Sequence, residues 1–246
     1  MTDTIHLIPD TDCANPITGD SAVGTLLTVR AYDFGHDNGL QVLRNSLEDA
    51  MTDLLRWRRP GPDHGHTAAD QHLPCPRCRS TPRPTCIKCK GTGWTDNPYW
   101  VGQSPDTLLR IHDEHEHRIK PGHRLHWTPV YLYEHSQSAL STTPFSCGWD
   151  SGLVGYLFIT GLEIKELMGV KNIYQHHIEQ ATAMMTGLLP ALEQWINGDC
   201  WGFELRRDGE VVDSCWGFYG SDIEQNGMAQ YLPANWKQLE VIVETP

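Results

Sequence analysis

Two closely spaced cysteine pairs constrain this chain more than any other feature of its sequence. Cys75 and Cys78 form the first C-x-x-C, Cys86 and Cys89 form the second, and seven residues separate the pairs. A C-x-x-C turn brings two thiolates to one ion, so two such turns can complete a four-coordinate tetrahedral site. A site of this kind leaves no open position for a substrate. The spacing therefore predicts one structural Zn²⁺ on these four cysteines, with an iron–sulfur cluster as the alternative.

The segment around these cysteines, residues 60–97, differs in composition from the rest of the chain. It is rich in Pro, Gly, His and Cys and poor in aliphatic residues. Because it has too few apolar side chains for a core of its own, its stability must come from a metal. We predict an inserted zinc module at 60–97 and a main domain formed by 1–59 and 98–246. The remaining cysteines are dispersed, which fits metal-bound thiolates in a reducing cytosol better than a disulfide framework.

The predicted module is also locally basic. Small basic zinc modules often contact nucleic acid, whereas basic residues can also serve only to keep a module with little core soluble. Both interpretations stay open from the sequence. The basic residues are Arg77, Arg79, Arg83, Lys88 and Lys90.

The chain as a whole is acidic, with a formal net charge of −12 over 246 residues. This charge argues against a general affinity for duplex DNA, whose phosphates need a basic surface. An acidic surface can instead bind a basic partner, including a protein site that normally holds nucleic acid. Hydrophobic residues make up 39%, which is enough for a folded core. We see no secretory signal and no run of ~18 apolar residues, so we expect a cytoplasmic protein without a membrane segment.

Periodicity and turn signals predict an α+β fold, in which a mainly antiparallel sheet packs with two or three helices and the zinc knuckle projects. Apolar residues have helical spacing at 39–57. Ser104 as N-cap, followed by Pro105, predicts the start of a second helix that runs to about residue 118. A third helical region, 172–197, contains Pro190, which we expect to kink or split it. Residues 136–151 are predicted as polar turns and 222–231 as a short polar helical stretch. Predicted strands are 5–8, 23–32, 130–133, 153–160, 200–206, 210–216 and 239–244.

The clearest local element is a hairpin centred on Asp208 and Gly209, a dipeptide typical of two-residue turns. A regular register from this centre places Glu204 directly opposite Asp213. Opposed carboxylates repel each other unless Arg206 next door, a proton or a bound cation neutralises them.

Several metal-ligating side chains share the predicted helix at 104–118. His112 and His115 are one turn apart and can share a metal ion, but the sequence supplies no third and fourth ligand. The alternative is a solvated polar helix face. The side chains concerned are His112, His115, Glu116 and His117.

Two short segments concentrate Cys, Trp, Asp and Gly. One runs from Ser141 to Gly152 (STTPFSCGWDSG) and the other from Asp213 to Gly220 (DSCWGFYG). Both resemble runs in a family of short acidic proteins from phages and mobile elements, in which a long helix separates them. The stretch 24–32 is also similar to that family, and the zinc module looks like an insertion that shorter members lack. The resemblance implies an origin in a phage or related element, and therefore a bacterial host cytoplasm.

The second cysteine pair carries a resemblance of its own. The run from Cys86 to Gly93 (CIKCKGTG) is similar to the C-x-x-C-x-G-x-G repeat of the zinc domain in DnaJ-type co-chaperones. The first pair lacks the two glycines, and the chain has no His-Pro-Asp tripeptide. The resemblance thus implies a zinc-binding turn and not a co-chaperone.

The two Cys- and Trp-rich segments also supply candidates for catalysis and binding. A thiol nucleophile, a His base and an Asp orienter can be assembled from them, although a free Cys is commonly just a small buried apolar residue. The catalytic candidates are His135, Cys147, Asp150, Asp213 and Cys215. A third interpretation is an exposed aromatic binding surface. Its residues are Trp149, Trp216, Phe218 and Tyr219.

Net charge and resemblance together favour a phage-encoded accessory protein that binds and inhibits a host protein. Counter-defence or host takeover is the expected setting, with acidic groups imitating the charge of nucleic acid. Two alternatives stay open. One is a zinc-dependent nucleic-acid-binding protein that uses the basic knuckle, and the other is a cysteine- or carboxylate-dependent hydrolase.

Overall fold

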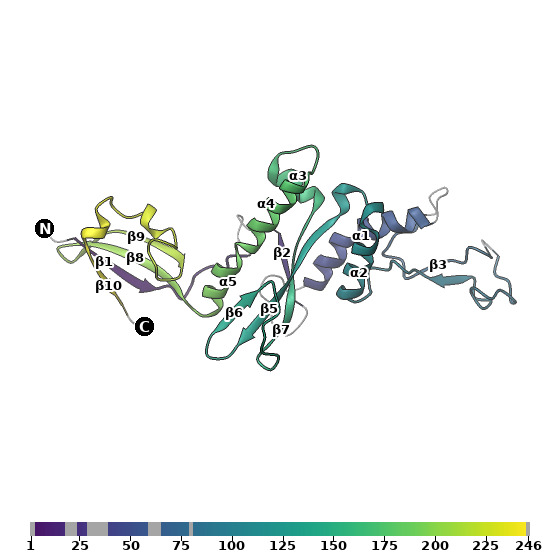
Figure 1. The fold of residues 1–246 in the computed structure, drawn as a ribbon, viewed down its shortest axis with the longest axis horizontal. Coiled ribbons are helices and arrows are strands. Elements are labelled where there is room, and N and C mark those ends of the chain that lie inside the picture. The colour runs from purple at the N-terminus through teal and green to yellow at the C-terminus, as the bar shows by residue number, and fades with distance from the viewer. Residues whose placement is uncertain (1–2, 18–23, 29–38, 59–64, 79–80, 245–246) are drawn as a thin grey trace. The chain divides into compact units, whose positions relative to one another are not determined.

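The computed structural model of this chain describes residues 3–17, 24–28, 39–58, 65–78 and 81–244 (Figure 1). Its fold is α+β with mainly antiparallel strand pairing, as the sequence predicts. The chain divides into two compact units. Unit 1 comprises 1–25, 129–155 and 183–246, and unit 2 comprises 26–128 and 156–182. The predicted module at 60–97 belongs to unit 2, and its origin as an insertion stays a prediction.

A four-stranded sheet in the order β10-β1-β8-β9 lies in unit 1. Its strands are β1 (Asp3–Pro9), β8 (Cys200–Arg207), β9 (Glu210–Tyr219) and β10 (Glu240–Val243). β8 is antiparallel to both neighbours, whereas β10 is parallel to β1. The core of this sheet includes Ile5, Leu7, Phe203 and Phe218, and the turns η3 (Met228–Gln230) and η4 (Trp236–Gln238) pack against it. Of the predicted helical stretch 222–231, only the 3₁₀ turn η3 forms.

The hairpin of β8 and β9 turns at Asp208 and Gly209, as predicted. These residues have φ angles of 50° and 91°, and a two-residue type I′ turn requires positive φ at both positions. Farther along the strands, Gly202 faces two residues of β9, Trp216 and Gly217. A Cβ atom at position 202 would lie 2.1 Å from the Trp216 indole, so a larger residue there would displace the ring.

The predicted pairing of Glu204 with Asp213 is wrong. Val212 is an extra residue in β9, and this bulge places Glu204 opposite Ser214 instead. Arg206 donates to the Glu204 carboxylate from Nε at 2.9 Å and from Nη2 at 2.6 Å. The two carboxylates therefore do not face each other, and no proton or cation is needed between them.

The second four-stranded sheet has the order β2-β7-β5-β6. Its strands are β2 (Thr25–Thr28), β5 (Leu125–Glu134), β6 (Ser138–Ser141) and β7 (Ser151–Thr160). Residues 29–32 of the predicted strand 23–32 lie outside the described residues. β6 falls in the segment predicted as polar turns, and side chains near α5 (Leu189–Ile196) hold it. Glu193 accepts from the Leu140 N–H at 2.8 Å, and the Asn197 side chain bonds both the N–H and the carbonyl of Ser138 at 2.8 Å.

The helical region 172–197 is split, as predicted. α4 (Gln175–Thr186) ends before α5 begins, and Pro190 lies in the first turn of α5. Helix α3 (Gly161–Met168) is not predicted by the sequence analysis, although Thr160 and Glu163 form a capping box at its start. Among the described helices, none is both long and apolar enough to cross a membrane.

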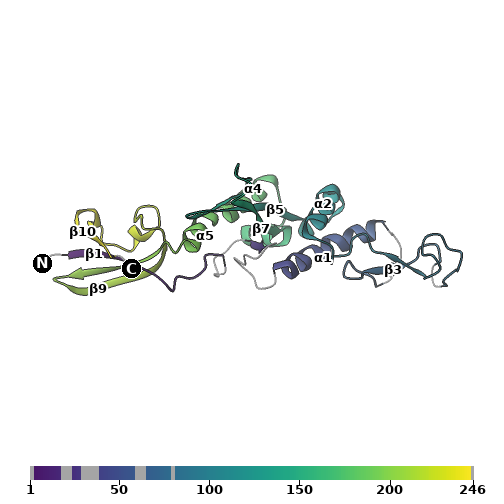
Figure 2. The ribbon, with the colours of Figure 1, turned by 90° about the horizontal axis from the view of Figure 1, so that it is seen from below.

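Helices α1 (Gly39–Arg58) and α2 (Pro105–His115) lie beside each other in unit 2 (Figures 1 and 2). The predicted helical spacing of α1 is confirmed, because Leu43, Leu47, Met51 and Leu54 are all fully buried. α2 begins at the predicted N-cap, Ser104. It is followed by two 3₁₀ turns, η1 (Glu116–Arg118) and η2 (Pro121–His123).

Asp53 of α1 is a buried carboxylate that connects this helix to η2. It accepts hydrogen bonds from the Lys120 N–H at 3.1 Å and from His123 Nδ1 at 2.8 Å, and the Lys120 ammonium lies 2.9 Å away. Burial alone raises the pKa of Asp53, but these donors outweigh burial and hold the pKa below its usual value. The ionised carboxylate therefore stabilises the folded state.

We expect Asp53→Asn to lower the free energy of unfolding by about 1–3 kcal/mol near neutral pH, because it weakens buried hydrogen bonds to a charged group. Asp49→Asn is the matched control, since Asp49 is 75% exposed and lies 3.9 Å from His123. Its cost should stay within about 0.5 kcal/mol. Urea unfolding measures both values, and equal losses in the two variants would contradict the assignment.

This contribution of Asp53 has a defined pH dependence. Because the folded-state pKa is lowered, the stabilisation is fully present above the unfolded-state pKa, about 3.9. It is lost as the pH falls through the folded-state pKa. The difference in unfolding free energy between the native protein and Asp53→Asn should therefore shrink on acidification below about pH 4.

The hairpin of β3 (His72–Pro74) and β4 (Trp94–Asp96) carries the four-cysteine segment. Polar bonds tie its base to α1: the Ala68 N–H donates to Thr52 Oγ1 at 3.0 Å. The Asn97 side-chain amide donates to the carbonyls of Thr67 and Asp70 at 3.3 and 2.9 Å. At the other end, the buried cluster in the described residues consists of the four cysteines alone. That composition agrees with a segment that has no apolar core.

Candidate metal centre and basic knuckle

The four predicted cysteine ligands converge beyond the β3–β4 hairpin. Their Sγ atoms all lie within 4.8 Å of one another, and all four residues are buried. Cys75 and Cys86 sulfurs are 3.8 Å apart, and Cys78 and Cys89 sulfurs are 3.5 Å apart. Disulfide sulfurs are only about 2.0 Å apart, so these thiols are not bonded to each other. The four sulfurs can hold one metal ion, and no other such group of three or more ligands occurs within the described ranges.

Backbone amides of the two cysteine turns act on the sulfur atoms. Burial raises the pKa of Cys75, but backbone N–H groups of its own turn outweigh burial and lower it. The Cys89 and Lys88 N–H groups lower the pKa of Cys86 to about 6 despite burial. Burial and the neighbouring thiols raise the pKa of Cys78 to about 12. A metal ion bound among these sulfurs would add a positive charge that favours the thiolate form of its ligands.

Two glycines that follow the second cysteine turn lie close to the first part of the knuckle. The Cys75 N–H donates to the Gly93 carbonyl at 2.7 Å. A Cβ atom on Gly93 would lie 2.8 Å from the Pro82 ring. Gly91 and Gly93 have φ angles of 88° and 82°, a region that glycine enters without steric cost. The C-x-x-C-x-G-x-G pattern thus marks two positions where the backbone itself requires glycine.

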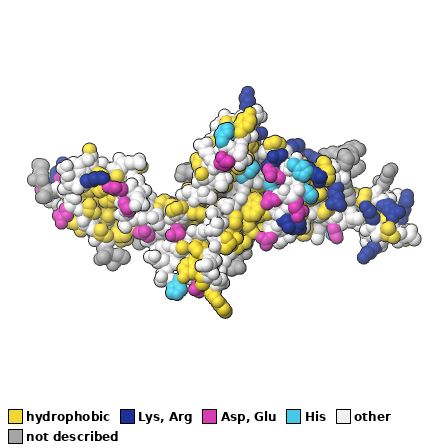
Figure 3. Space-filling view, viewed as in Figure 1, with side chains coloured by type: hydrophobic (Ala, Val, Ile, Leu, Met, Phe, Trp, Pro, Cys, Tyr) yellow, Lys and Arg dark blue, Asp and Glu magenta, His cyan; other side chains and the backbone are white. Residues whose placement is uncertain are grey.

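The basic residues of the knuckle, defined here as residues 75–94, lie on its surface. Arg77, Arg83, Lys88 and Lys90 are exposed, and Arg79 lies outside the described residues. Within the described part of the chain, none of these four cations forms an ion pair with a carboxylate. Figure 3 shows Lys and Arg side chains gathered over the part of unit 2 that contains β3 and the knuckle turns.

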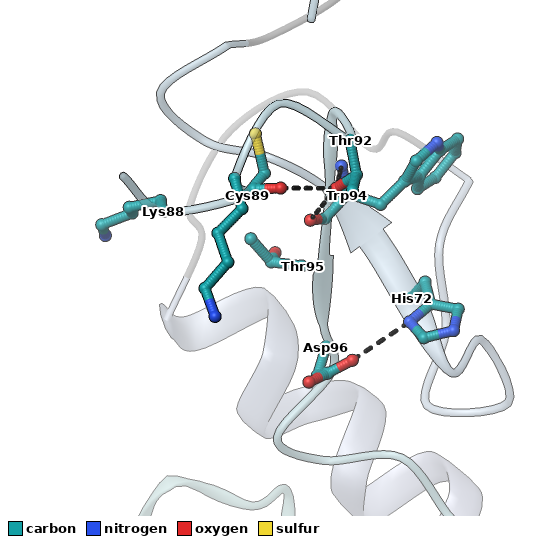
Figure 4. Close-up of a pocket in the computed structure, with 8 residues that line it drawn as sticks. His72, Lys88, Cys89, Thr92, Trp94, Thr95 and Asp96 are labelled. Carbon is teal, nitrogen blue, oxygen red and sulfur yellow. Dashed lines mark hydrogen bonds and ion pairs between the residues drawn. The ribbon is translucent and has the colours of Figure 1, made fainter. Parts of the chain in front are cut away.

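An open hollow of about 750 Å³ lies beside the metal centre (Figure 4). Both hairpin strands and the second cysteine turn form its wall. The lining residues are His72, Lys88, Cys89, Lys90, Thr92, Trp94, Thr95 and Asp96. The hollow thus combines two predicted cations with an indole that the sequence analysis did not include among the site residues. A Trp directly after the Gly-x-Gly turn is the signal that could have identified it.

The predicted aromatic surface is not a single surface. Trp149 is 97% exposed between β6 and β7, whereas Trp216 lies in β9 of the other sheet. Phe218 is buried in the core of that sheet, so its predicted place in an exposed surface is wrong. Tyr219 donates from its hydroxyl to the Ala14 carbonyl at 2.7 Å, which gives it a structural contact.

The structure brings only some of the predicted catalytic residues together. Cys147 Sγ donates to the Asp150 carboxylate at 3.8 Å, and the Asp150 carbonyl accepts a backbone N–H from the end of β5, next to His135. No hydrogen bond joins the Cys147 thiol to an imidazole among the residues that the structure describes. Asp213 and Cys215 lie in β9, where Cys215 packs against the apolar core. Catalysis by these side chains stays a prediction.

The histidine-rich helix face is not uniformly solvated. His112 is buried, its Nε2 accepts from the Leu125 N–H at 2.9 Å, and its Nδ1 lies 2.9 Å from the Asp113 carboxylate. Because both ring nitrogens have partners in the protein, His112 has no free lone pair for a metal. His115 and His117 join no three-ligand group within the described residues.

Comparisons of the chain with protein-family models, with curated proteins and with solved structures give no match. The resemblances to phage proteins and to the DnaJ-type zinc turn therefore stay predictions that rest on the sequence runs alone. Function is inferred below from the site itself.

We expect Cys86→Ser to reduce bound metal from one ion per chain to near zero, because it removes one of the four ligands. Loss of the metal should also let trypsin cleave after Arg77, Lys88 and Lys90, which a closed knuckle protects. Cys147→Ser is the matched control, since it removes a thiol from a loop in unit 1. Elemental analysis of dialysed protein and timed proteolysis measure both effects. The assignment fails if Cys86→Ser keeps the metal content and trypsin resistance of the control.

Proposed function

We propose that the metal ion is Zn²⁺ and that its role is structural. A four-sulfur site suits zinc and iron–sulfur centres. Zinc bound tetrahedrally at about 2.3 Å would place its sulfur ligands about 3.8 Å apart. The observed separations of 3.8 and 3.5 Å fit a single ion, whereas a cluster of several irons would spread the thiolates farther. The four cysteines would fill every coordination position, so this ion would support the fold and not a reaction.

We further propose that the zinc-ordered knuckle binds nucleic acid. The observation that carries this proposal is the local charge: residues 75–94 contain five Lys or Arg and no Asp or Glu. The whole chain has a net charge of −12, so the residues outside the knuckle carry −17. The knuckle thus carries a formal net charge of +5 in a chain whose remainder is acidic, although 14 of the 19 Lys and Arg residues lie outside it. Phosphate contacts would be made there, and the rest of the chain would repel polyanions.

The knuckle cations also differ in their pairing from several cations elsewhere in the chain. Arg110, Lys120 and Arg206 lie 2.7, 2.9 and 2.6 Å from carboxylates of the same chain. The four cations that the structure describes in the knuckle have no carboxylate partner in the described residues. An unpaired exposed cation can bind a phosphate and release counterions, whereas a paired one must first give up its partner.

The simpler role for these cations is solubility. A surface that only keeps a protein soluble normally mixes charges of both signs. The knuckle lacks carboxylates altogether, and its cations are interspersed in the sequence with the four cysteines, which would fix the backbone between them once a metal is bound. This combination supports binding of an anionic partner over solubility alone.

The combined change of Lys88→Gln and Lys90→Gln should weaken binding to a fluorescently labelled single-stranded oligonucleotide. It should also reduce the slope of log Kd against log salt concentration by about 1.4, since each phosphate contact to a single strand contributes about 0.7. Lys165→Gln with Lys171→Gln is the matched control, because it removes two positive charges outside the knuckle. Fluorescence anisotropy over a series of salt concentrations measures both slopes.

Two results would count against this function. Equal slopes in the two double variants would remove Lys88 and Lys90 from the contact. No binding by the zinc-loaded wild-type protein at low salt would contradict the proposal as a whole.

The predicted inhibition of a host protein, with its phage setting, stays a prediction. A charge of −17 outside the knuckle supports a basic partner in electrostatic terms. The same charge also serves solubility, and Phe218 of the separately predicted aromatic surface is buried. Nucleic-acid binding is therefore the function that the described geometry supports best.

A further inference from the structure

We infer that the nucleic acid bound by the knuckle is unpaired, with one base stacked on Trp94 and the flanking phosphates held by Lys88 and Lys90. This inference rests on the proposed function. It adds that the ligand is single-stranded and that Trp94, an aromatic residue, contacts it.

Trp94 presents an aromatic face without a partner among the described residues. It is 52% exposed. Trp57 is similarly exposed, at 51%, but the Arg118 guanidinium lies 3.5 Å from the centre of its ring. Trp149 is more exposed still, yet its neighbour in the chain is Asp150, which repels phosphate. Trp94 thus lies near cations, as Trp57 does, but no cation covers its ring among the described residues.

The backbone at Trp94 is fixed by groups that belong to the metal centre. The Thr92 hydroxyl donates to the Cys89 carbonyl at 2.7 Å and accepts from the Trp94 N–H at 3.2 Å. The preceding residue, Gly93, accepts from the Cys75 N–H at 2.7 Å. Because Cys75 and Cys89 are both in the metal-binding group, metal binding would set the indole in place before a ligand arrives. A preorganised aromatic face loses less conformational entropy when a base stacks on it.

Trp94, Lys88 and Lys90 line the same hollow (Figure 4). An apolar stacking face and two ammonium groups around one space match the chemistry of a nucleotide, which joins a flat base to anionic phosphate. The carboxylate in this wall, Asp96, lies 3.2 Å from His72 Nδ1. In Figure 4 the Asp96–His72 pair lies below the Trp94 indole, so this carboxylate already has a cationic partner when His72 is protonated.

An unpaired strand fits this hollow better than a duplex. Bases inside a duplex are stacked on one another, and an aromatic side chain can stack only on a base that is free of that stack. Reading a duplex requires an element that enters a groove, usually a helix or a two-stranded ribbon. The described residues of the knuckle contain no helix, and the β3–β4 ribbon that carries it is only three residue pairs long.

The test compares Trp94→Leu, which keeps an apolar side chain but removes the aromatic face, with Trp94→Phe, which keeps an aromatic face. Trp149→Ala is the control for loss of an exposed indole elsewhere. The probes are fluorescently labelled oligothymidylate, oligouridylate and a DNA duplex of similar length, each added to the full, zinc-loaded chain. Anisotropy gives Kd, and zinc content and trypsin resistance report the fold of each knuckle.

We expect the wild-type protein to bind both single strands more tightly than the duplex. Trp94→Leu should weaken single-strand binding about tenfold, which corresponds to about 1.4 kcal/mol and to one base stacked on an aromatic ring. Trp94→Phe should retain most of the affinity, and Trp149→Ala should retain all of it. Single strands should also quench the tryptophan fluorescence of the wild-type protein more than that of Trp94→Phe.

Three results would overturn the inference. The first is equal affinity of the wild-type protein for duplex and single strands, and the second is unchanged single-strand binding by Trp94→Leu. The third is equal quenching in the wild-type protein and Trp94→Phe, a comparison that holds even if Trp94→Leu loses its zinc. The proposed function would survive any of these results if the effect of the Lys88 and Lys90 substitutions persists. Failure of the wild-type protein to bind any probe would instead reject the proposed function itself.

Discussion

The convergence of four cysteine sulfurs is the constraint on which the rest of the knuckle depends. Among the described residues of this segment the buried cluster consists of these cysteines alone, without an apolar core. Gly93 accepts a hydrogen bond from the Cys75 N–H, and the Thr92 hydroxyl donates one to the Cys89 carbonyl. Removing the ion would therefore disturb the backbone, the cations and the indole together. Under the proposed function, the metal would affect binding through geometry and would take no part in the contact.

The knuckle is basic, whereas the rest of the chain carries a net negative charge. A basic segment of this size can make only a few phosphate contacts, and its affinity should fall as salt rises. The acidic remainder opposes any spread of nucleic acid beyond the knuckle. A short, salt-sensitive contact is the expected result, and it needs no basic character in the whole chain.

The features that the sequence predicts well are local. The cysteine ligands lie between positions 75 and 89, so their spacing reports their geometry directly. The hairpin turn at Asp208 and Gly209 and the N-cap at Ser104 are likewise determined by a few adjacent residues. Helix α3 also has a local signal, Thr160 with Glu163, but the preceding strand ends at Thr160 and its pattern concealed the start of the helix.

The features that the sequence predicts poorly depend on contacts between distant residues. The β8–β9 register changes at Val212 and at Gly217, and the second change accompanies the packing of Trp216 on Gly202. No periodicity in β9 alone reveals such bulges, which is why the predicted partner of Glu204 was wrong. Phe218 is buried by contacts with other parts of unit 1, including Phe203 and Tyr231. The hollow next to the cysteines combines residues of both hairpin strands, and only the folded hairpin shows that Trp94 and the lysines share it.

The polar strand β6 has a consequence for how copies of this protein behave together. It is the last strand of its sheet, and such an edge is a template on which a strand from another molecule can form. Here Glu193 and Asn197 already bond the backbone of Leu140 and Ser138. The side chains of Glu193 and Asn197 therefore occupy the backbone groups at this edge. They oppose aggregation in which a strand of a second molecule pairs with β6.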